Sequence, residues 1–404
     1  MKLPDAEWQK REGLEGLLGA LDAAAGETRY VGGSVRDGLL GLPVSDIDLA
    51  TRLAPEAVME RLQRAHIKAV PTGIAHGTVT AVLPGGPVEI TTLRRDVSTD
   101  GRRATVAYTD DWREDAARRD FTINALSADP LTGDVHDYFG GEEDLAARHV
   151  RFIGEPLTRI AEDHLRILRF FRFHARFGQG APDAAALAAC SERANDLMAL
   201  SRERIADELL KLLALPDPAE TVALMVRHAI FVPVLPEIAD AAPLLGLLER
   251  ERASDSAPDG LRRLAALLPA DPTVATSVAA RLRLSRKAAK RLATIAARET
   301  KDIREPKMLA YHVGIEEACD RLLLGDAEPA AVACAVRMLR AWSLPVLHVG
   351  GGDLIAMGLR PGPEVARTLQ AIERAWMERG FPADREAVRS LAREIVDQAL
   401  RASQ

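Results

Sequence analysis

Aromatic residues, cysteines and long apolar runs are all scarce in this sequence. Phe, Trp and Tyr make up 4% of the 404 residues, whereas alanine and leucine are plentiful, which favours helix. The three cysteines, Cys190, Cys319 and Cys334, are scattered, which excludes a disulfide framework and a cysteine metal cluster. No apolar run approaches the roughly 20 residues of a membrane span, and residues 1–16 lack the apolar core of a signal peptide. We therefore expect a cytoplasmic protein that does not associate with membranes.

The sequence also lacks a net positive charge. Its formal net charge of −6 argues against diffuse binding to nucleic acid but leaves room for a local basic patch. Residues 281–291, RLRLSRKAAKR, form such a patch, with six basic residues and no acid. Two interpretations stay open for this segment: a solvated helix face, or a surface that contacts RNA phosphates irrespective of base sequence.

A turn with two glycines lies near the start of the chain, where Tyr30 and Val31 end a predicted short strand. Gly32 and Gly33 allow backbone N–H groups to face a phosphate without a Cβ in the way. Residues 34–40 are predicted to form a short helix whose N-terminus points at the same anion. The pattern indicates a site for a phosphate group.

Two acids, Asp46 and Asp48, follow in a second predicted strand. Side chains at i and i+2 of a strand share a face, and their Cα atoms lie roughly 7 Å apart. That span suits two carboxylates that hold a pair of Mg²⁺ ions for phosphoryl chemistry. Glu89, in a strand predicted over residues 88–93, is either a third carboxylate near the metals or a structural residue.

The order of these features resembles the active-site signature of the polymerase-β-type nucleotidyltransferases. In detail, G-G-x-V-R-D…L-G…D-x-D is similar to the branch that contains the bacterial class II tRNA CCA-adding enzymes and poly(A) polymerases. The resemblance implies that Asp46 and Asp48 bind Mg²⁺ and that Gly33 and Arg36 hold a triphosphate. It also implies an α+β fold: a small mixed-sheet nucleotidyltransferase head over residues 1–145, then an all-helical neck (146–217), body (218–340) and RNA-binding tail (341–404).

Three further segments carry structural expectations. Residues 5–25 are predicted to form one packing helix. Residues 94–114 are polar and poorly periodic, so we expect a mobile loop, which by resemblance takes part in the switch from adding C to adding A. Residues 115–128 are predicted to start a helix, and R-R-D-F-T-I-N-A within them resembles the second motif of the family. The resemblance assigns Arg119 to the triphosphate.

The segment 158–177 is predicted to be one helix, with Asp163, Arg166, Arg169 and Arg172 at three-residue intervals on one face. Its E-D-x-x-R resembles the nucleotide-recognising motif of the family. A carboxylate accepts and a guanidinium donates, so Asp163 beside Arg166 complements the amino donor and ring acceptor that cytosine and adenine share. Uracil and guanine present the reverse order. Arg169 and Arg172 are expected to continue the stripe towards the phosphates.

A capped helix is predicted over residues 201–214. It resembles the fifth motif of the family, E-R-x-x-x-E. We give it a scaffold role, in which Glu203, Arg204 and Glu208 brace the neck.

The resemblance implies addition of CCA to the 3′ end of tRNA from CTP and ATP, with release of pyrophosphate. The partners are then tRNA and the two nucleotides, and no protein partner is predicted. A poly(A) polymerase, or an enzyme that adds only part of CCA, is the close alternative. A non-catalytic RNA-binding protein and a nucleotidyltransferase for small molecules are further alternatives, disfavoured by the intact Asp46/Asp48 pair and by the long helical part.

Overall fold

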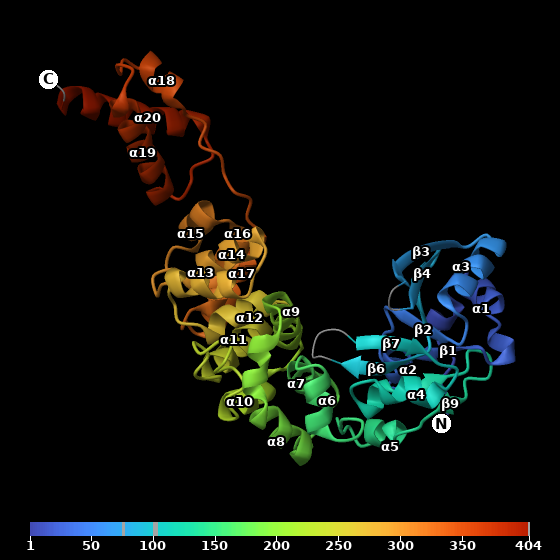
Figure 1. The fold of residues 1–404 in the computed structure, drawn as a ribbon. Coiled ribbons are helices and arrows are strands. Elements are labelled where there is room, and N and C mark those ends of the chain that lie inside the picture. The colour runs from blue at the N-terminus through green and yellow to red at the C-terminus, as the bar shows by residue number, and fades with distance from the viewer. Residues whose placement is uncertain (75–76, 100–103, 403–404) are drawn as a thin grey trace. The chain divides into compact units, whose positions relative to one another are not determined.

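The computed structural model describes residues 1–74, 77–99 and 104–402, and the chain divides into two compact units. A seven-stranded mixed sheet and a two-stranded sheet lie in the first unit, and the other described elements are helices, so the predicted α+β class is confirmed (Figure 1). The first unit contains Met1–Ala242, Pro258–Gly260 and Ala280–Leu284, and the second contains Pro243–Ala257, Leu261–Ala279 and Ser285–Gln404. The finer division into head, neck, body and tail stays a prediction. Within the described residues, no helix is both long and apolar enough to cross a membrane.

A seven-stranded sheet forms the centre of the N-terminal part, in the order β3-β4-β5-β2-β1-β8-β9. β2 pairs with β5 in parallel, while the other neighbours pair antiparallel. The strands are β1 (Thr28–Val31), β2 (Ile47–Thr51), β3 (Lys68–Gly73), β4 (Thr78–Leu83), β5 (Gly86–Thr92), β8 (Ser127–Ala128) and β9 (Val135–His136). The strands predicted around Tyr30, Asp48 and residues 88–93 are therefore confirmed.

Helices cover one face of this sheet. α3 (Pro55–Arg64) packs against β3 and β4, and α1 (Leu14–Ala20) packs against α3, while α2 (Gly33–Leu39) packs against β1 and β2 (Figure 1). Successive side chains of a strand point to opposite faces, so the buried Val79, Ala81, Val88 and Ile90 mark the covered face. The alternate residues of β4 and β5 belong to the other face, where Glu89 is exposed.

The prediction of one helix over residues 5–25 is wrong. The segment forms η1 (Glu7–Lys10), α1 and η2 (Ala23–Ala25), and Gly13 separates the first two with φ of +87°. A residue with positive φ cannot continue a right-handed helix. The apolar positions behind the prediction, Leu14, Leu17, Leu18 and Leu21, are all buried.

The loop predicted over residues 94–114 is also wrong in most of its length. β6 (Arg94–Thr99) and β7 (Ala104–Tyr108) pair antiparallel, and residues 100–103 lie outside the described residues. The sequence here lacks the alternating apolar pattern of a strand, which is why a loop was predicted. Hydrogen bonding between the two strands forms the hairpin without that pattern. α4 (Trp112–Ala117) follows, capped by Asp111, whose side chain accepts a hydrogen bond from Arg113 N.

Residues 115–128 do not form the predicted helix. α4 ends at Ala117, Phe121 is extended and bridges to Phe152, and η4 (Thr122–Asn124) and β8 follow. Phe121 is fully buried against Phe152 and Phe173, so burial of this ring decides the backbone conformation.

The rest of the first unit is helical, and the predicted helix over 158–177 is broken. α6 ends at Glu162, Asp163 is extended with φ of −152° and ψ of 106°, and α7 begins at Arg166. The prediction for 201–214 is confirmed, with the Ser201 side chain accepting from Arg204 N. The helices are α5 (Gly141–Ala146), α6 (Pro156–Glu162), α7 (Arg166–Phe177), α8 (Ala184–Glu192), η5 (Ala194–Ala199), α9 (Arg202–Leu213) and α10 (Ala219–Arg227).

The second unit is helical throughout its described secondary structure. A separate apolar core forms in its C-terminal part around Leu354, Ile372, Trp376 and Leu391. The helices from residue 242 onward are α11 (Ala242–Ala253), α12 (Gly260–Leu267), α13 (Pro272–Arg281), α14 (Arg286–Ala296), α15 (Pro306–Val313), α16 (Ile315–Leu324), α17 (Pro329–Arg340), α18 (Gly351–Ala356), α19 (Pro363–Glu378) and α20 (Arg385–Ala402).

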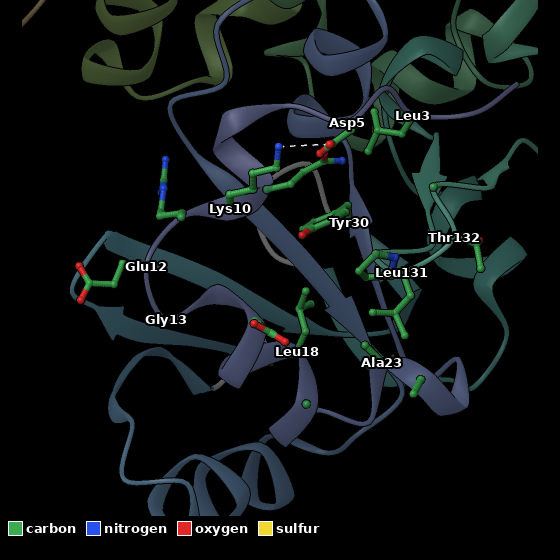
Figure 2. A pocket seen from close by; sticks show the side chains of 17 residues that line it. Leu3, Asp5, Lys10, Glu12, Gly13, Leu18, Ala23, Tyr30, Leu131 and Thr132 are labelled. Atoms are coloured by element: carbon green, nitrogen blue, oxygen red, sulfur yellow. Dashed lines mark ion pairs between the residues drawn. The ribbon is translucent and has the colours of Figure 1, made fainter.

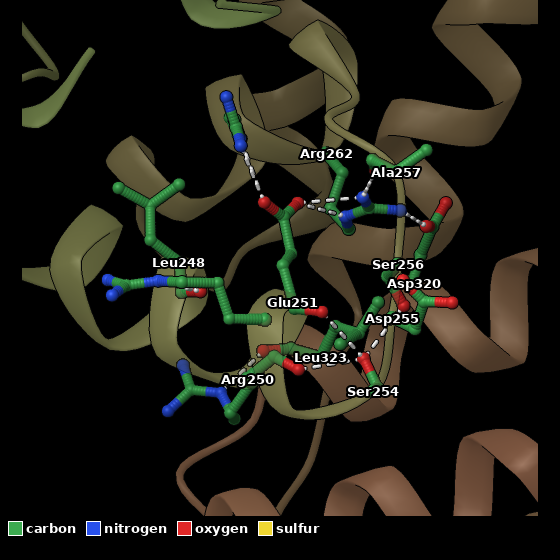
Figure 3. A network of polar contacts seen from close by, with 12 residues as sticks. Leu248, Arg250, Glu251, Ser254, Asp255, Ser256, Ala257, Arg262, Asp320 and Leu323 are labelled. Atoms are coloured by element: carbon green, nitrogen blue, oxygen red, sulfur yellow. Dashed lines mark hydrogen bonds and ion pairs between the residues drawn. The ribbon is translucent and has the colours of Figure 1, made fainter. Parts of the chain in front are cut away.

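A buried network of charges links α11, α12 and α16 (Figure 3). Glu251 is 3% exposed and accepts from Arg262 Nε at 2.8 Å and from Arg263 Nε at 2.9 Å. Arg262 also donates to Asp320 Oδ1 at 2.9 Å. Buried charges are tolerated where they are paired and hydrogen-bonded in this way.

The basic segment 281–291 is not one solvated helix face. Arg281 pairs with Glu237, Arg283 with Glu203, and Arg291 with Asp320. The other three basic residues, Arg286, Lys287 and Lys290, are exposed in the first turns of α14. The contact of this segment with RNA phosphates stays a prediction.

Candidate active site

Three carboxylates come together at the start of β2. Asp48 is half-buried in β2, and Asp46 is exposed immediately before the first strand residue. Asp48 is in register with Glu89 on the parallel neighbour β5, so the two side chains lie on adjacent strands and share a face. The register places Glu89 next to Asp48, and its role as a third carboxylate for the metals or as a structural residue stays a prediction.

The pKa of Asp48 is raised. Burial is the main cause, and the negative charges of Glu89 and Asp46 add to it, while Arg119 and Arg36 act in the opposite direction. A cation at this point would relieve the repulsion between the carboxylates.

The donor set fits Mg²⁺. Among the residues that the structure describes, no group of three or more histidine, cysteine, aspartate or glutamate side chains is arranged to hold a metal ion by itself. Mg²⁺ does not need such a cage, because it prefers oxygen ligands and is held by one or two carboxylates together with substrate phosphates and water.

A pocket of about 420 Å³ opens beside Asp48. This volume lies within the range typical of small-molecule sites. Of the residues predicted from the sequence, it brings together Gly33, Arg36, Asp48, Arg119, Asp163, Arg166 and Arg169, and its lining is completed by Gly32, Asp120, Asn124 and Phe173. Asp46 and Arg172 do not belong to the lining.

Gly32 is a site residue that the sequence interpretation passed over in favour of Gly33. It precedes α2 with φ of +65°, and a Cβ at this position would lie 2.8 Å from Nη1 of Arg119. Arg119 itself donates to the Asn124 carbonyl at 3.4 Å and pairs with Asp115 at 3.3 Å. The pair of adjacent glycines in the sequence was the signal that could have identified Gly32 as a site residue. The close approach of Arg119 shows why a side chain at Gly32 would disturb the site.

Replacement of Gly32 by alanine is expected to displace Arg119 and to raise KM for the nucleotide roughly tenfold, as loss of one charge-assisted hydrogen bond costs about 1.5–3 kcal/mol. Steady-state kinetics with varied nucleotide concentration measures this change in KM. Gly26→Ala is the matched control, because Gly26 has φ of +77° and open space around its Cβ position. Gly26 is left-handed helical, with ψ of 12°, where a side chain costs about 1–2 kcal/mol. Gly32 has ψ of −123°, outside that region, so its backbone penalty is larger and the comparison is made on KM of the folded protein. An equal KM in the two variants would contradict the role of the Gly32–Arg119 contact.

Arg36 is held by protein groups. It is 6% exposed, donates Nε to Asp37 Oδ1 at 2.7 Å and Nη1 to Asn124 Oδ1, and lies over the Phe177 ring at 4.2 Å. Burial is the main cause that lowers the pKa of Arg36. The predicted contact of Arg36 with the triphosphate stays a prediction, and the partners seen favour a positioning role.

Arg169 and Arg172 also have partners on the protein. Arg169 donates Nε to the buried Asp120 at 2.7 Å, and this pairing lowers the pKa of Asp120 against the opposing effect of burial. Arg172 pairs with Glu208 on α9 at 2.5 Å, outside the pocket. Arg169 and Arg172 were expected to lie in one row of polar side chains leading to the phosphates. Arg169 lines the pocket, whereas Arg172 does not.

Asp163 and Arg166 line the same pocket, although no continuous helix face carries them. Asp163 accepts from Leu165 N at 3.1 Å and from Arg204 Nη2 at 2.7 Å. Arg166 donates to the Arg118 carbonyl at 3.1 Å. Arg166 also pairs with Glu162 at 2.5 Å. The turn between α6 and α7 thus brings both residues to the lining of one pocket, each held by partners on the protein.

The scaffold assignment for α9 holds for two of its three residues. Arg204 fixes Asp163, and Glu208 pairs with Arg172 and with Arg169. Glu203 does not brace the neck, because its carboxylate pairs with Arg283 at 2.9 Å.

A larger cavity of about 800 Å³ lies elsewhere in the head (Figure 2). Leu3, Leu18, Tyr30 and Leu131 give it an apolar floor, and the Lys10–Asp5 ion pair lies at its rim. None of the predicted site residues lines it. The smaller pocket beside Asp48 is therefore the candidate active site.

Known proteins match the chain over nearly its whole length. Residues 28–151 match the family described as "Poly A polymerase head domain", and residues 182–242 match "Probable RNA and SrmB- binding site of polymerase A". The CCA tRNA nucleotidyltransferase 1, mitochondrial, of Homo sapiens is 34% identical, with 96% of this chain and 92% of that protein aligned. The chain belongs to the CCA-adding enzyme family.

Two bacterial relatives extend this result. The CCA-adding enzyme of Streptococcus gordonii is 35% identical, with 94% of this chain and 96% of that enzyme aligned. The crystal structure of the Bacillus stearothermophilus CCA-adding enzyme in complex with CTP superimposes with a TM-score of 0.75 at 28% identity, covering 96% of this chain and 99% of that one. The family, the fold class and the nucleotidyltransferase class predicted from the sequence are confirmed.

Proposed function

We propose that this enzyme adds CCA to the 3′ end of tRNA from CTP and ATP, with Mg²⁺ as cofactor. In the reaction the RNA 3′-oxygen forms a bond to the α-phosphorus of the nucleotide, and the bond to pyrophosphate breaks. The observation that carries the proposal is that one pocket combines Asp48, a cluster of arginines and the Asp163–Arg166 pair. The relatives named above are CCA-adding enzymes, one of them in complex with CTP.

The carboxylates of Asp46 and Asp48 would hold the metal, with Glu89 beside them. When bound, Mg²⁺ lowers the pKa of the 3′-hydroxyl and neutralises charge on the departing pyrophosphate. Arg119 lines the pocket and is the guanidinium placed to bind phosphate oxygens, since its planar fork donates two hydrogen bonds at once. The cytoplasmic location expected from the sequence belongs to this proposal.

Asp163 and Arg166 would select the base. The carboxylate accepts from the exocyclic amino group, and the guanidinium donates to the ring nitrogen, in both cytosine and adenine. Uracil or guanine would leave both protein groups unpaired, at roughly 1–3 kcal/mol each. The same two side chains can thus accept CTP and ATP without a template.

Arg204→Ala is expected to weaken this selection, because it removes the guanidinium that fixes Asp163 at 2.7 Å. Discrimination of CTP against UTP, measured as the ratio of kcat/KM, should fall roughly tenfold, which corresponds to about 1.4 kcal/mol. Lys211→Ala is the matched control on the same helix, since Lys211 pairs with the exposed Asp207. Unchanged discrimination in Arg204→Ala would count against base selection by Asp163.

The proposal is tested by incubating the protein with tRNA that lacks its 3′ CCA, in CTP alone, ATP alone or both. Full-length CCA ends are expected only with both nucleotides, with pyrophosphate released in proportion. Sustained addition of A to unstructured RNA without use of CTP would overturn CCA addition in favour of a poly(A) polymerase.

A further inference from the structure

The face of the sheet that carries Asp48 continues away from the acids over three more strands. In register, Asp48 lies beside Glu89 on β5, Glu89 beside Thr80 on β4, and Thr80 beside Val70 on β3. A second row runs beside the first, with Pro87 on β5, Val82 on β4 and Lys68 on β3 in register. Side chains in register share a face, so both rows end on β3, while Asp48 lies in the first row and Asp46 immediately precedes β2.

From Asp48 outward most side chains of this face are exposed or half-buried, whereas Thr80 is buried. On the β1 side it is closed, because Ala50 is buried with Leu93 and Trp112. Towards β3, by contrast, Val82 is 41% and Val70 37% exposed. The two valines lie on neighbouring strands of the same face and add apolar surface to it.

Four threonines on this face form hydrogen bonds with one another in pairs. Thr72 and Thr80 share a hydrogen bond at 2.8 Å, and Thr78 and Thr91 share one at 3.2 Å. Lys68 is exposed, and no residue that the structure describes forms an ion pair with it. The result is a flat apolar shelf, Pro87, Val82 and Val70, with acids at one end and a lysine at the other.

The distances fit the end of an RNA strand. From β2 to β3 is three strand spacings, about 14 Å. A 3′-terminal nucleotide whose hydroxyl lies at Asp46 and Asp48 would place its sugar and base on the shelf and an upstream phosphate at Lys68. Apolar contact suits a ribose or base of any kind, and a lysine contacts a phosphate irrespective of sequence.

We propose that this shelf binds the 3′-terminal nucleotides of the acceptor RNA, with Lys68 as a phosphate contact and Val82 as the centre of the apolar surface. The inference rests on the proposed function, because it takes the reacting hydroxyl to lie at Asp46 and Asp48. Two observations support it: the shelf is continuous with the acids through the strand register, and its charges complement the RNA end.

The test measures KM for tRNA lacking CCA, KM for CTP, and the salt dependence of the Kd for tRNA in Lys68→Ala and Val82→Asp. Lys68→Ala should raise KM for tRNA roughly tenfold and reduce the slope of log Kd against log salt by about 1, leaving KM for CTP unchanged. Val82→Asp should raise KM for tRNA at least as much. Lys10→Ala and Leu131→Asp are the matched controls, since both residues are exposed on the head away from the shelf.

The proposal is overturned if Lys68→Ala, which cannot disturb a core, keeps the wild-type KM for tRNA and the wild-type salt slope. It is overturned equally if Val82→Asp changes only the oligomeric state, which would make the face an interface between copies. Failure of the function itself looks different, because the wild-type protein would then incorporate no CMP or AMP into tRNA.

Discussion

Asp48→Asn is expected to lower nucleotide incorporation by about 10³-fold. A metal ion contributes several kcal/mol of charge stabilisation in the transition state, and each 1.4 kcal/mol is a factor of ten in rate. The asparagine keeps the shape of the side chain but loses the charge that binds the ion. Single-turnover incorporation of CMP into tRNA lacking CCA measures the effect.

The same substitution is expected to leave the fold intact and to stabilise it near neutral pH. Burial and the charge of Glu89 raise the pKa of Asp48. A raised pKa in the folded state means that the protonated form is preferred, so this stabilisation is present below the ordinary pKa of aspartate and is lost as pH rises through the raised value. At pH 7 the ionised Asp48 therefore costs stability, and asparagine removes that cost.

Thermal unfolding across pH checks the sign of this effect. Asp134→Asn is the control, because hydrogen bonding from Thr132 lowers the pKa of this exposed carboxylate. The control should retain activity and show no gain in Tm at neutral pH. An Asp48→Asn protein that still extends RNA at the wild-type rate would refute the assignment of the metal site.

The second large effect is expected in the second unit. Glu251→Gln removes the charge that both Arg262 and Arg263 contact, and leaves guanidinium groups that are 7% and 2% exposed. Breaking a buried pair of this kind costs about 3–5 kcal/mol, because the buried guanidinium groups lose the charge of this carboxylate. Asp320 still contacts Arg262.

Urea unfolding followed by circular dichroism measures the loss, and hydrogen exchange in α12 and α16 locates it. Glu394→Ala is the matched control, since Glu394 forms an exposed pair with Arg379. CTP binding to the head should survive in both variants. Full protection of α12 in Glu251→Gln would show that the network does not stabilise this unit.

The part of the site made by consecutive residues was predictable from the sequence. Gly33 and Asp48 lie at the helix start and in the strand that the local patterns predict, because glycine tolerance and the two-residue period of a strand are local properties. Asp46, predicted within the same strand, lies immediately before it. The register of Asp48 with Glu89 depends on pairing between strands 41 residues apart. The sequence alone therefore did not show whether Glu89 lies next to Asp48.

The helical half was less predictable. Three-residue spacing favoured one helix from 158 to 177, but Asp163 is extended and is held by Arg204, a residue 41 positions later in the chain. Arg36 and Arg172 likewise have partners, Asn124 and Glu208, that no local pattern connects to them. A spacing rule shows which side chains share a helix face only where the helix is unbroken.

The parallel pairing of β2 with β5 has a consequence for how activity is acquired. Asp48 and Glu89 are 41 residues apart, with α3, β3 and β4 between them in the chain. Contacts that close such long loops form late and slowly. A partly folded chain therefore presents no assembled acid pair, and the capacity to handle nucleotides should appear only when the head is complete.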